Sequence, residues 1–189
     1  MTDNVELRTE RLLLRPYRLE DVGDVYAYAK DPGWDWFLVP GSPQPYTRRN
    51  AEESIARRLK APWGTSPSFA MVLDSVVIGG IHLSVDEFHE NAQLSYSLAR
   101  VHWGKGLTTE AATAIVDWGF GELGLAKVYG NSDLRHVASW RVMEKIGMTR
   151  EGVLRSHRRT REGRSDRVYY GILREDWEAA SEDDSGGRP

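Results

Sequence analysis

The spacing of apolar residues changes repeatedly along this chain, and that change limits the folds open to it. Leu94, Tyr96 and Leu98 alternate with polar residues, as in a half-buried strand. Soon after, Ala111 and Ile115 recur at helical spacing. The same reading predicts strands at residues 10–15, 69–73, 76–83, 92–98, 127–131, 149–155 and 167–173, and helices at 19–29, 47–60, 108–120 and 138–146. This order predicts a mixed α/β (α+β) domain.

The composition narrows the class of protein. The 189 residues suit one domain. The absence of cysteine excludes a disulfide, a cysteine zinc site, an iron–sulfur cluster and a thiol nucleophile. No apolar run approaches the ~20 residues that span a bilayer, and residues 1–7 lack the pattern of a signal peptide. The net charge of −3 weighs against direct nucleic-acid binding. We expect a cytoplasmic protein without membrane contact, in which the acidic and Gly-rich residues 178–189 are frayed or disordered.

The stretch from Ser95 to Ala111 carries the most chemical information, because a strand runs into Trp103-Gly-Lys-Gly106 and a helix starts at once. Glycine lets the backbone turn tightly and approach a ligand. The first amides of a helix have no partner within it and carry the positive end of the helix dipole. The arrangement suits a pyrophosphate, with Lys105 adding a charge, or else it is a tight turn with a solvated lysine. The spacing excludes a Walker loop, and no G-x-G-x-x-G occurs.

Four stretches together resemble the GNAT acetyltransferase family, and most closely its RimJ/RimL-like branch, which acetylates N-terminal amines of ribosomal proteins. They are Thr9–Arg15 (TERLLLR), Leu94–Leu98 (LSYSL), Trp103–Ala111 (WGKGLTTEA) and Ala138–Gly152 (ASWRVMEKIGMTREG), in the family's order and spacing. The resemblance implies one GNAT domain over residues 1–177. Its mixed twisted sheet would have six or seven strands, helices on both faces, and a splay between the fourth and fifth strands, at 92–98 and 127–131.

The resemblance also implies a reaction. Acetyl-CoA would insert between the splayed strands, with its pantetheine held by the main chain around Leu98. An amine from the other side of the sheet would attack the thioester directly, without a metal, and Ser139 would contact the coenzyme and protonate the leaving thiolate. His136 stands where the family has a coenzyme-binding asparagine. The amides expected to bind the pyrophosphate are those of Trp103, Gly104, Lys105, Gly106, Leu107 and Thr108.

Other positions depart from the family's pattern. Met143 replaces a tyrosine that acts as general acid in many members, Val101 replaces a Gln or Arg that opens the phosphate motif, and Gln93 replaces a glutamate base. Ribosomal-protein members also carry a carboxylate after Gly152 that is missing here. The base stays open among His82, Glu87, His89, His157 and an ordered water. Gln93, His136 and Met143 leave a second class of function open, a CoA-binding module with little catalysis.

The missing carboxylate predicts the kind of amine that is acetylated. Deprotonating a lysine amine of pKa ~10.4 costs about 4 kcal/mol at pH ~7.4, whereas an α-amine costs under ~1 kcal/mol. A site without a strong base should therefore favour an N-terminal α-amine of a protein or peptide. The alternative acceptor is a small-molecule amine, such as an antibiotic or a peptide toxin.

Two further features of the sequence each have two interpretations. Trp34, Trp36 and Trp63 could stack on a planar or sugar substrate, or hold the first two helices against the sheet. The seven arginines between Arg150 and Arg167 fit a solvated hairpin face, with an acidic partner or the CoA 3′-phosphate as the alternatives. GNAT proteins are often dimers, so a homodimer also stays open.

Overall fold

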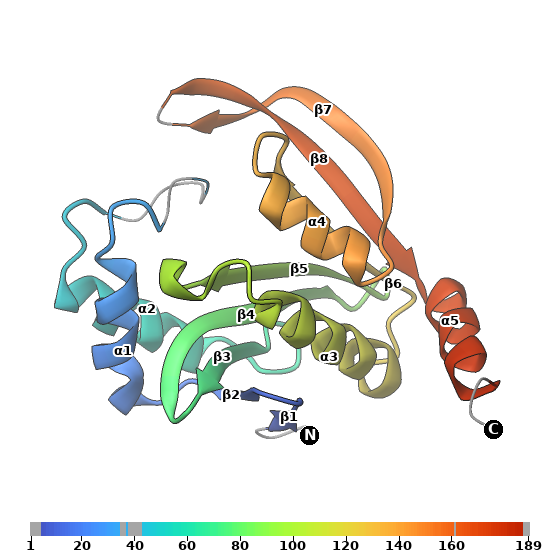
Figure 1. Cartoon of the computed structure of the whole chain (residues 1–189), viewed down its shortest axis with the longest axis horizontal. Helices are drawn as coiled ribbons and strands as arrows, with labels where there is room; N and C mark the ends of the chain where they lie inside the picture. Colours follow the sequence, from blue (N-terminus) through green and yellow to red (C-terminus); the bar gives the residue numbers. More distant parts are fainter. Residues whose placement is uncertain (1–4, 35–36, 38–42, 161, 187–189) are drawn as a thin grey trace.

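One mixed sheet organises the molecule (Figure 1). The computed structural model describes residues 5–34, 37, 43–160 and 162–186. The sheet has eight strands in the order β1-β2-β3-β4-β5-β6-β8-β7. The elements are β1 (Leu7–Arg8), β2 (Leu13–Pro16), η1 (Leu19–Asp21), α1 (Val22–Ala29), α2 (Arg48–Lys60), β3 (Ser68–Leu73), β4 (Val76–Asp86), β5 (Asn91–Leu98), η2 (Arg100–His102), α3 (Leu107–Glu122), β6 (Lys127–Asp133), α4 (Val137–Lys145), β7 (Thr149–Thr160), β8 (Gly163–Leu173) and α5 (Arg174–Gly186).

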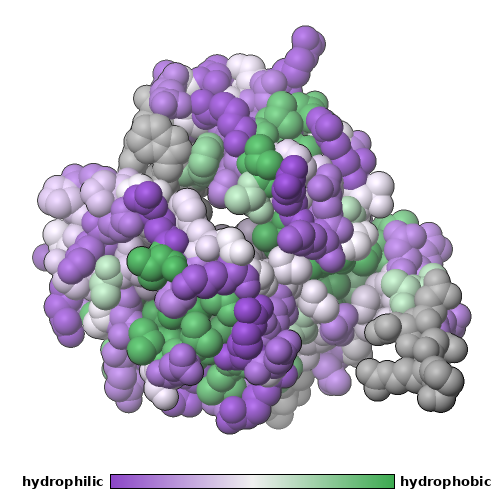
Figure 2. Space-filling view, in the orientation of Figure 1, coloured by the Kyte–Doolittle hydropathy of each residue, from purple (hydrophilic) through white to green (hydrophobic). Residues whose placement is uncertain are grey.

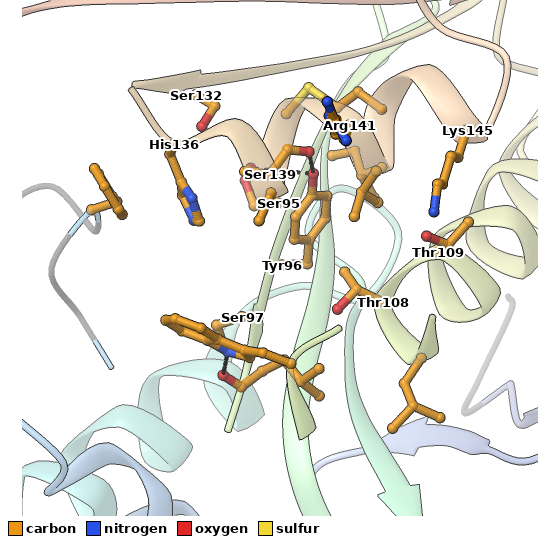
Figure 3. A pocket seen from close by; sticks show the side chains of 18 of the residues that line it. Ser95, Tyr96, Ser97, Thr108, Thr109, Ser132, His136, Ser139, Arg141 and Lys145 are labelled. Carbon is orange, nitrogen blue, oxygen red and sulfur yellow. Dashed lines mark hydrogen bonds between the residues drawn. The ribbon is translucent and has the colours of Figure 1, made fainter. Parts of the chain in front are cut away.

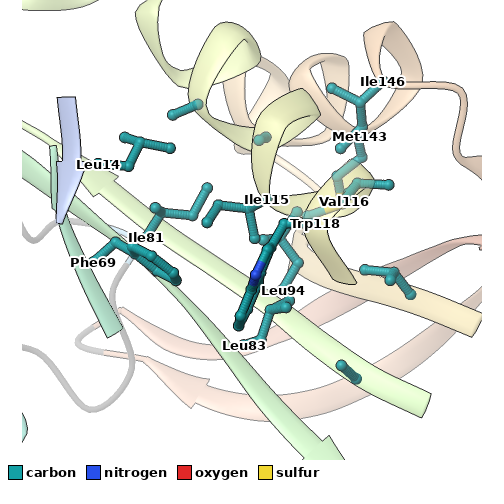
Figure 4. Close-up of a cluster of buried hydrophobic side chains, with 14 of the residues drawn as sticks. Leu14, Phe69, Ile81, Leu83, Leu94, Ile115, Val116, Trp118, Met143 and Ile146 are labelled. Atoms are coloured by element: carbon teal, nitrogen blue, oxygen red, sulfur yellow. The ribbon is translucent and has the colours of Figure 1, made fainter. Parts of the chain in front are cut away.

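Two separate clusters of buried side chains cover the two faces of the sheet. The larger lies under α3 and α4 and includes Leu83, Ile115 and Met143 (Figure 4). The smaller lies under α1 and α2, around Val25 and Ile55. The predicted fold class, with helices on both faces of a mixed sheet, is confirmed.

The splay between the two central strands is also confirmed. β5 and β6 are parallel and pair only from Asn91–Lys127 to Gln93–Tyr129. Beyond that pair β5 continues to Leu98 and β6 to Asp133, with no partner residues shared between them. A gap therefore opens toward the carboxyl ends of both strands.

The structure differs from the sequence-based prediction at both ends of the chain. The sheet has eight strands rather than six or seven, because the two-residue β1 is too short to show a period. Residues 178–186 belong to α5 instead of a frayed tail. The Trp177 ring stacks on Phe120 at 5.3 Å and its indole donates to Asp117, and these contacts hold the start of this helix. No helix in the described ranges is long and apolar enough to cross a membrane.

Candidate active site

A row of free amides begins just before α3. Gly106 is the N-cap of this helix at φ +79°, and Gly104 has φ +75°, values that favour glycine. From Gly104 to Thr109 no amide donates to a protein acceptor within the described residues. The Trp103 amide, which the prediction included, donates to the Arg100 carbonyl at 3.0 Å because η2 precedes it. The free amides therefore run from Gly104 to Thr109, one position further along than expected.

Glu110 ties this loop to the beginning of the chain. Its carboxylate accepts hydrogen bonds from the Thr9 hydroxyl at 2.5 Å and from the Arg11 amide at 2.8 Å. The Arg11 side chain donates to Glu110 as well and to the Lys105 carbonyl at 3.0 Å. Two of the four motif stretches thus meet, and their contacts fix the backbone that carries the free amides.

A cavity of about 460 Å³ runs from these amides along α4 to the gap between β5 and β6. Figure 2 shows the surface hollowed at the centre of this face. Lys105 does not line the cavity. The cationic side chains that line it on α4 are Arg141 and Lys145, and Figure 3 shows Lys145 close to Thr109. Of the predicted residues, Leu98, Trp103, Gly104, Gly106, Leu107, Thr108, His136 and Ser139 do line it. Within the described ranges no group of three or more His, Asp or Glu is placed to hold a metal ion.

The β5 edge of the gap presents main-chain groups. Ala99 donates to the Ile78 carbonyl on the β4 side at 2.8 Å. Because hydrogen-bonding direction alternates along a strand, Leu98 and Tyr96 direct their main-chain groups toward the gap. The Leu98 carbonyl already accepts a bond from the Trp103 indole at 2.8 Å. The Leu98 amide and both groups of Tyr96 therefore remain for a ligand lying in the gap.

Tyr96 and Ser139 form the polar corner of the cavity (Figure 3). The Tyr96 hydroxyl donates to the Ser139 carbonyl at 2.7 Å and lies 3.3 Å from the Ser139 hydroxyl. Burial raises the pKa of Tyr96, so the phenol keeps its proton. Met143, at the position of the family's tyrosine, is buried in the core. Sequence reasoning missed Tyr96, because its place in the alternation is that of an ordinary inward-facing strand residue.

A second cavity, of about 670 Å³, lies on the α2 side of the sheet. The two cavities share Trp34 and residues Ser95–Ser97, so they meet at the free part of β5. His82 lines the second cavity, and its Nδ1 lies 3.1 Å from the Pro67 carbonyl. Since a carbonyl only accepts, Nδ1 carries the proton and Nε2 of the neutral ring is free to accept one.

The candidate bases are thereby separated by position. Burial lowers the pKa of His82, which keeps its ring neutral at pH 7. The other three, Glu87, His89 and His157, line neither cavity. Only His82 among the four faces the space that an acceptor would enter.

The aromatic residues of the first loops have different surroundings. Trp34 lines both cavities, and its indole nitrogen is buried without a partner in the described structure. Trp63 packs edge-on against Phe69 at 4.9 Å and belongs to the core. His136 stacks on Phe37 at 4.3 Å, and burial lowers its pKa. Trp36 lies outside the described residues.

Comparison with known proteins decides the family. A model described as "Acetyltransferase (GNAT) domain" matches residues 11–149, most of the chain. The chain belongs to the GNAT acetyltransferase family. This GNAT protein is 27% identical over 175 residues to the Bacillus subtilis protein named "Uncharacterized N-acetyltransferase YnaD", a match that covers 92% of the chain and 99% of that relative. Its class of activity is N-acetyl transfer.

Solved structures agree with this assignment. A GNAT-family acetyltransferase from Bacillus anthracis superposes with a TM-score of 0.81 at 25% identity, covering 90% of this GNAT protein and 99% of that chain. Two more distant structures share the fold. The ribosomal-protein-S5-alanine acetyltransferase of Vibrio fischeri has a TM-score of 0.79 at 18% identity, over 92% and 98% of the two chains. The microcin C7 self-immunity acetyltransferase MccE, solved with acetyl-CoA and AMP, has a TM-score of 0.76 at 15% identity, over 87% and 93%.

Proposed function

We propose that this GNAT protein is a cytoplasmic enzyme that transfers the acetyl group of acetyl-CoA to the N-terminal α-amine of a protein or peptide. The observation that carries the proposal is the meeting of two cavities at Ser95–Ser97, where β5 has no neighbour on its gap side. A coenzyme entering from the α3 side and an amine entering from the α2 side would come together at that edge. Direct transfer needs such a meeting point and no covalent intermediate.

The first cavity fits the coenzyme. The six free amides of Gly104–Thr109 suit the pyrophosphate, because amides at a helix N-terminus bind anions. Arg141 and Lys145 would bind its other phosphate oxygens, and the main chain of Tyr96 and Leu98 would hold the pantetheine. His136 and Trp103 would close the sides of the cavity. Acetyl-CoA, with which MccE was solved in complex, supplies the reactive thioester when bound.

Two side chains on opposite faces of the sheet would carry out the proton transfers. Ser139 would protonate the departing thiolate, with Tyr96 orienting it through their hydrogen bonds. His82 would accept the proton of the amine at Nε2, through an ordered water in the second cavity. A neutral histidine is a weak base, and this favours an α-amine over a lysine.

Two kinds of acceptor are supported by particular observations. A protein N-terminus agrees with the RimJ/RimL-like motifs and with the name of the Vibrio fischeri neighbour. A small-molecule amine is the second candidate, favoured by the buried, unpartnered indole of Trp34 at the junction of the cavities. The name of MccE, a self-immunity acetyltransferase, agrees with that second candidate.

Thiol release from acetyl-CoA tests the proposal with two peptides that differ only in the kind of amine they carry. The first has a free α-amine and no lysine; the second has a blocked α-amine and one lysine. We expect kcat/KM to be about 100-fold higher for the first, from the ~3 kcal/mol difference in deprotonation. Equal values would contradict the proposal. If the protein binds acetyl-CoA but releases no thiol from it with any peptide or small amine as acceptor, the protein would be a CoA-binding module instead.

A further inference from the structure

Arg167 on β8 lines the first cavity with an unusual set of partners. Its Nε donates to the Asn131 side-chain oxygen at 3.1 Å, and one terminal nitrogen, Nη2, donates to the same residue. In the part of the chain that the structure describes, no carboxylate lies within 4.0 Å of Arg167, and the other terminal nitrogen, Nη1, has no protein partner. A half-buried guanidinium is thus held by a neutral amide alone.

Some other cations that are removed from solvent have acidic partners, whereas half-buried Arg58 donates to Ser54 and lies over the Tyr17 ring. Partly buried Arg174 pairs with Glu178 at 3.6 Å. Arg15 pairs with Asp21 at 2.7 Å. The acid beside Arg167 in the sheet register is Asp133, but both of its oxygens accept bonds of 3.0 Å from Arg135. Asp133 is therefore already engaged by another cation. Because a buried charge is costly without a partner, Arg167 points to an anion that arrives with a ligand.

A second arginine increases the positive charge at the same place. Arg158 on β7 lines the cavity as well, and burial together with the charge of Arg158 lowers the pKa of Arg167. Among the described lining residues there are four cationic side chains and no Asp or Glu. Two of the four, Arg141 and Lys145, are on α4, whereas the two arginines lie on the β7–β8 hairpin that reaches over α4 in Figure 1.

Arg167 lies at the end of the cavity away from α3. Burial and the charge of Arg167 lower the pKa of His136, and Figure 3 shows His136 on the other side of Ser139 from Thr108 and Thr109. Ser95 lines both cavities. An anion on Arg167 would therefore lie in the same cavity as Ser95, away from the amides at the start of α3.

We propose that Arg167, assisted by Arg158, binds a carboxylate carried by the acceptor, so that preferred acceptors are peptides with an acidic side chain in their first two residues. The proposal rests on the proposed function. Arginine suits this task because its planar fork can donate two parallel bonds to one carboxylate. Both arginines line the first cavity, away from the amides that would bind the pyrophosphate, so the anion would come from an acceptor that reaches this cavity through the junction at Ser95–Ser97.

Two peptides that differ only by Asp or Asn at the second position test this subsite. For the wild-type enzyme we expect kcat/KM for the Asp peptide to be about 10- to 100-fold higher, the range for a charged hydrogen bond. In Arg167→Gln the two peptides should become equal. The matched control is Arg155→Gln, which removes one charge from the same hairpin at an exposed residue that lines neither cavity, and it should keep the preference.

Further measurements distinguish an acceptor carboxylate from a coenzyme phosphate as the anion on Arg167. Arg158→Gln changes an exposed residue and is the second test of the subsite in case Arg167→Gln does not fold. It should weaken the Asp preference. Calorimetry with acetyl-CoA should give the same Kd for wild type and Arg167→Gln. A weakened Kd with an unchanged peptide preference would show that the anion is a coenzyme phosphate and would overturn the proposal. An absence of turnover with every peptide would count against the proposed function. In that case peptide binding still tests the subsite, and tighter binding of the Asp peptide to wild type than to Arg167→Gln would support it. Equal binding would overturn it.

Discussion

Hydrogen bonds give the hydroxyls of Tyr96 and Ser139 different tasks. The Tyr96 proton is directed at the Ser139 carbonyl, 2.7 Å away, whereas the Ser139 hydroxyl faces the cavity beside the phenol oxygen. The serine is therefore the better placed of the two to give up a proton to a leaving thiolate, and the tyrosine fixes the first turn of α4. This assignment divides between two residues what the family gives to one tyrosine, whose position Met143 occupies in the core.

Replacing Ser139 by alanine should lower kcat about 100-fold and leave the KM for acetyl-CoA nearly unchanged, because a proton donor acts on the chemical step. Steady-state thiol release measures both constants. Ser132→Ala is the matched control, since Ser132 is a buried serine of the same cavity with no part in the proposed proton transfer. A raised KM with unchanged kcat would mean that Ser139 only binds the coenzyme.

Asp133 makes the end of β6 sensitive to acid. Hydrogen bonds from Arg135 lower the pKa of this buried carboxyl from 3.8 to about 2. Folding therefore favours the charged form, and its stabilisation of about 2 kcal/mol is complete above pH 4 and is lost as the pH falls from 4 toward 2. Asp133→Asn should be less stable than wild type by that amount at pH 7, by urea unfolding. The difference should shrink at pH 3; a difference that is equal at both pH values would refute this account.

The loop before α3 depends on a contact between distant segments. Glu110 holds Thr9 and Arg11, and Arg11 holds the Lys105 carbonyl, so the first strands position the amides of Gly104–Thr109. The loop keeps its shape only when Glu110 and its partners in the first strands are both present. The two stretches, TERLLLR and WGKGLTTEA, therefore act as one unit in the fold.

Glu110→Ala should weaken acetyl-CoA binding about tenfold in calorimetry, because the loop loses its support. The direction of the change in affinity separates two effects of Glu110, because removing a carboxylate near an anion site would by charge alone tighten acetyl-CoA binding. The control is Glu122→Ala, an exposed glutamate at the other end of the same helix, which should leave the Kd unchanged. Tighter binding by Glu110→Ala would show that the charge of Glu110 matters more than its contacts.

The sequence is sufficient to predict those parts of the molecule whose signals are local. The helix predicted at residues 47–60 begins at the Thr47 cap, whose side chain accepts a hydrogen bond from the Asn50 amide, and Gly147 follows the helix predicted at 138–146 with φ +84°. The alternation at Leu94–Leu98 and the helical spacing after Thr108 correctly predict the strand and the helix on either side of the loop at Gly104–Gly106. The amide row moves by one residue only because η2 uses the Trp103 amide.

The residues that sequence reasoning missed depend on long-range placement. Tyr96 meets Ser139 from 43 positions away, so its spacing in the strand says nothing of its hydroxyl. For the arginines from Arg150 to Arg167 the sequence leaves both a solvated hairpin face and an anion-binding role open, and only the path of β7 and β8 shows that Arg158 and Arg167 are the ones of this run that line the cavity. Trp177 looks like the last residue before a polar tail, yet its packing on Phe120 holds the start of α5.

Both faces of the sheet take part in the proposed reaction, and a bisubstrate analogue tests that claim most directly. The analogue is CoA joined through an acetyl bridge to the α-amine of a peptide, and the measurement is a crystal structure of its complex. We expect the CoA part along Gly104–Thr109 and the gap between β5 and β6, with the bridge at Ser95–Ser97 and the peptide in the cavity that holds His82. An analogue that lies wholly on the α3 side of the sheet, with the second cavity unfilled, would contradict the account.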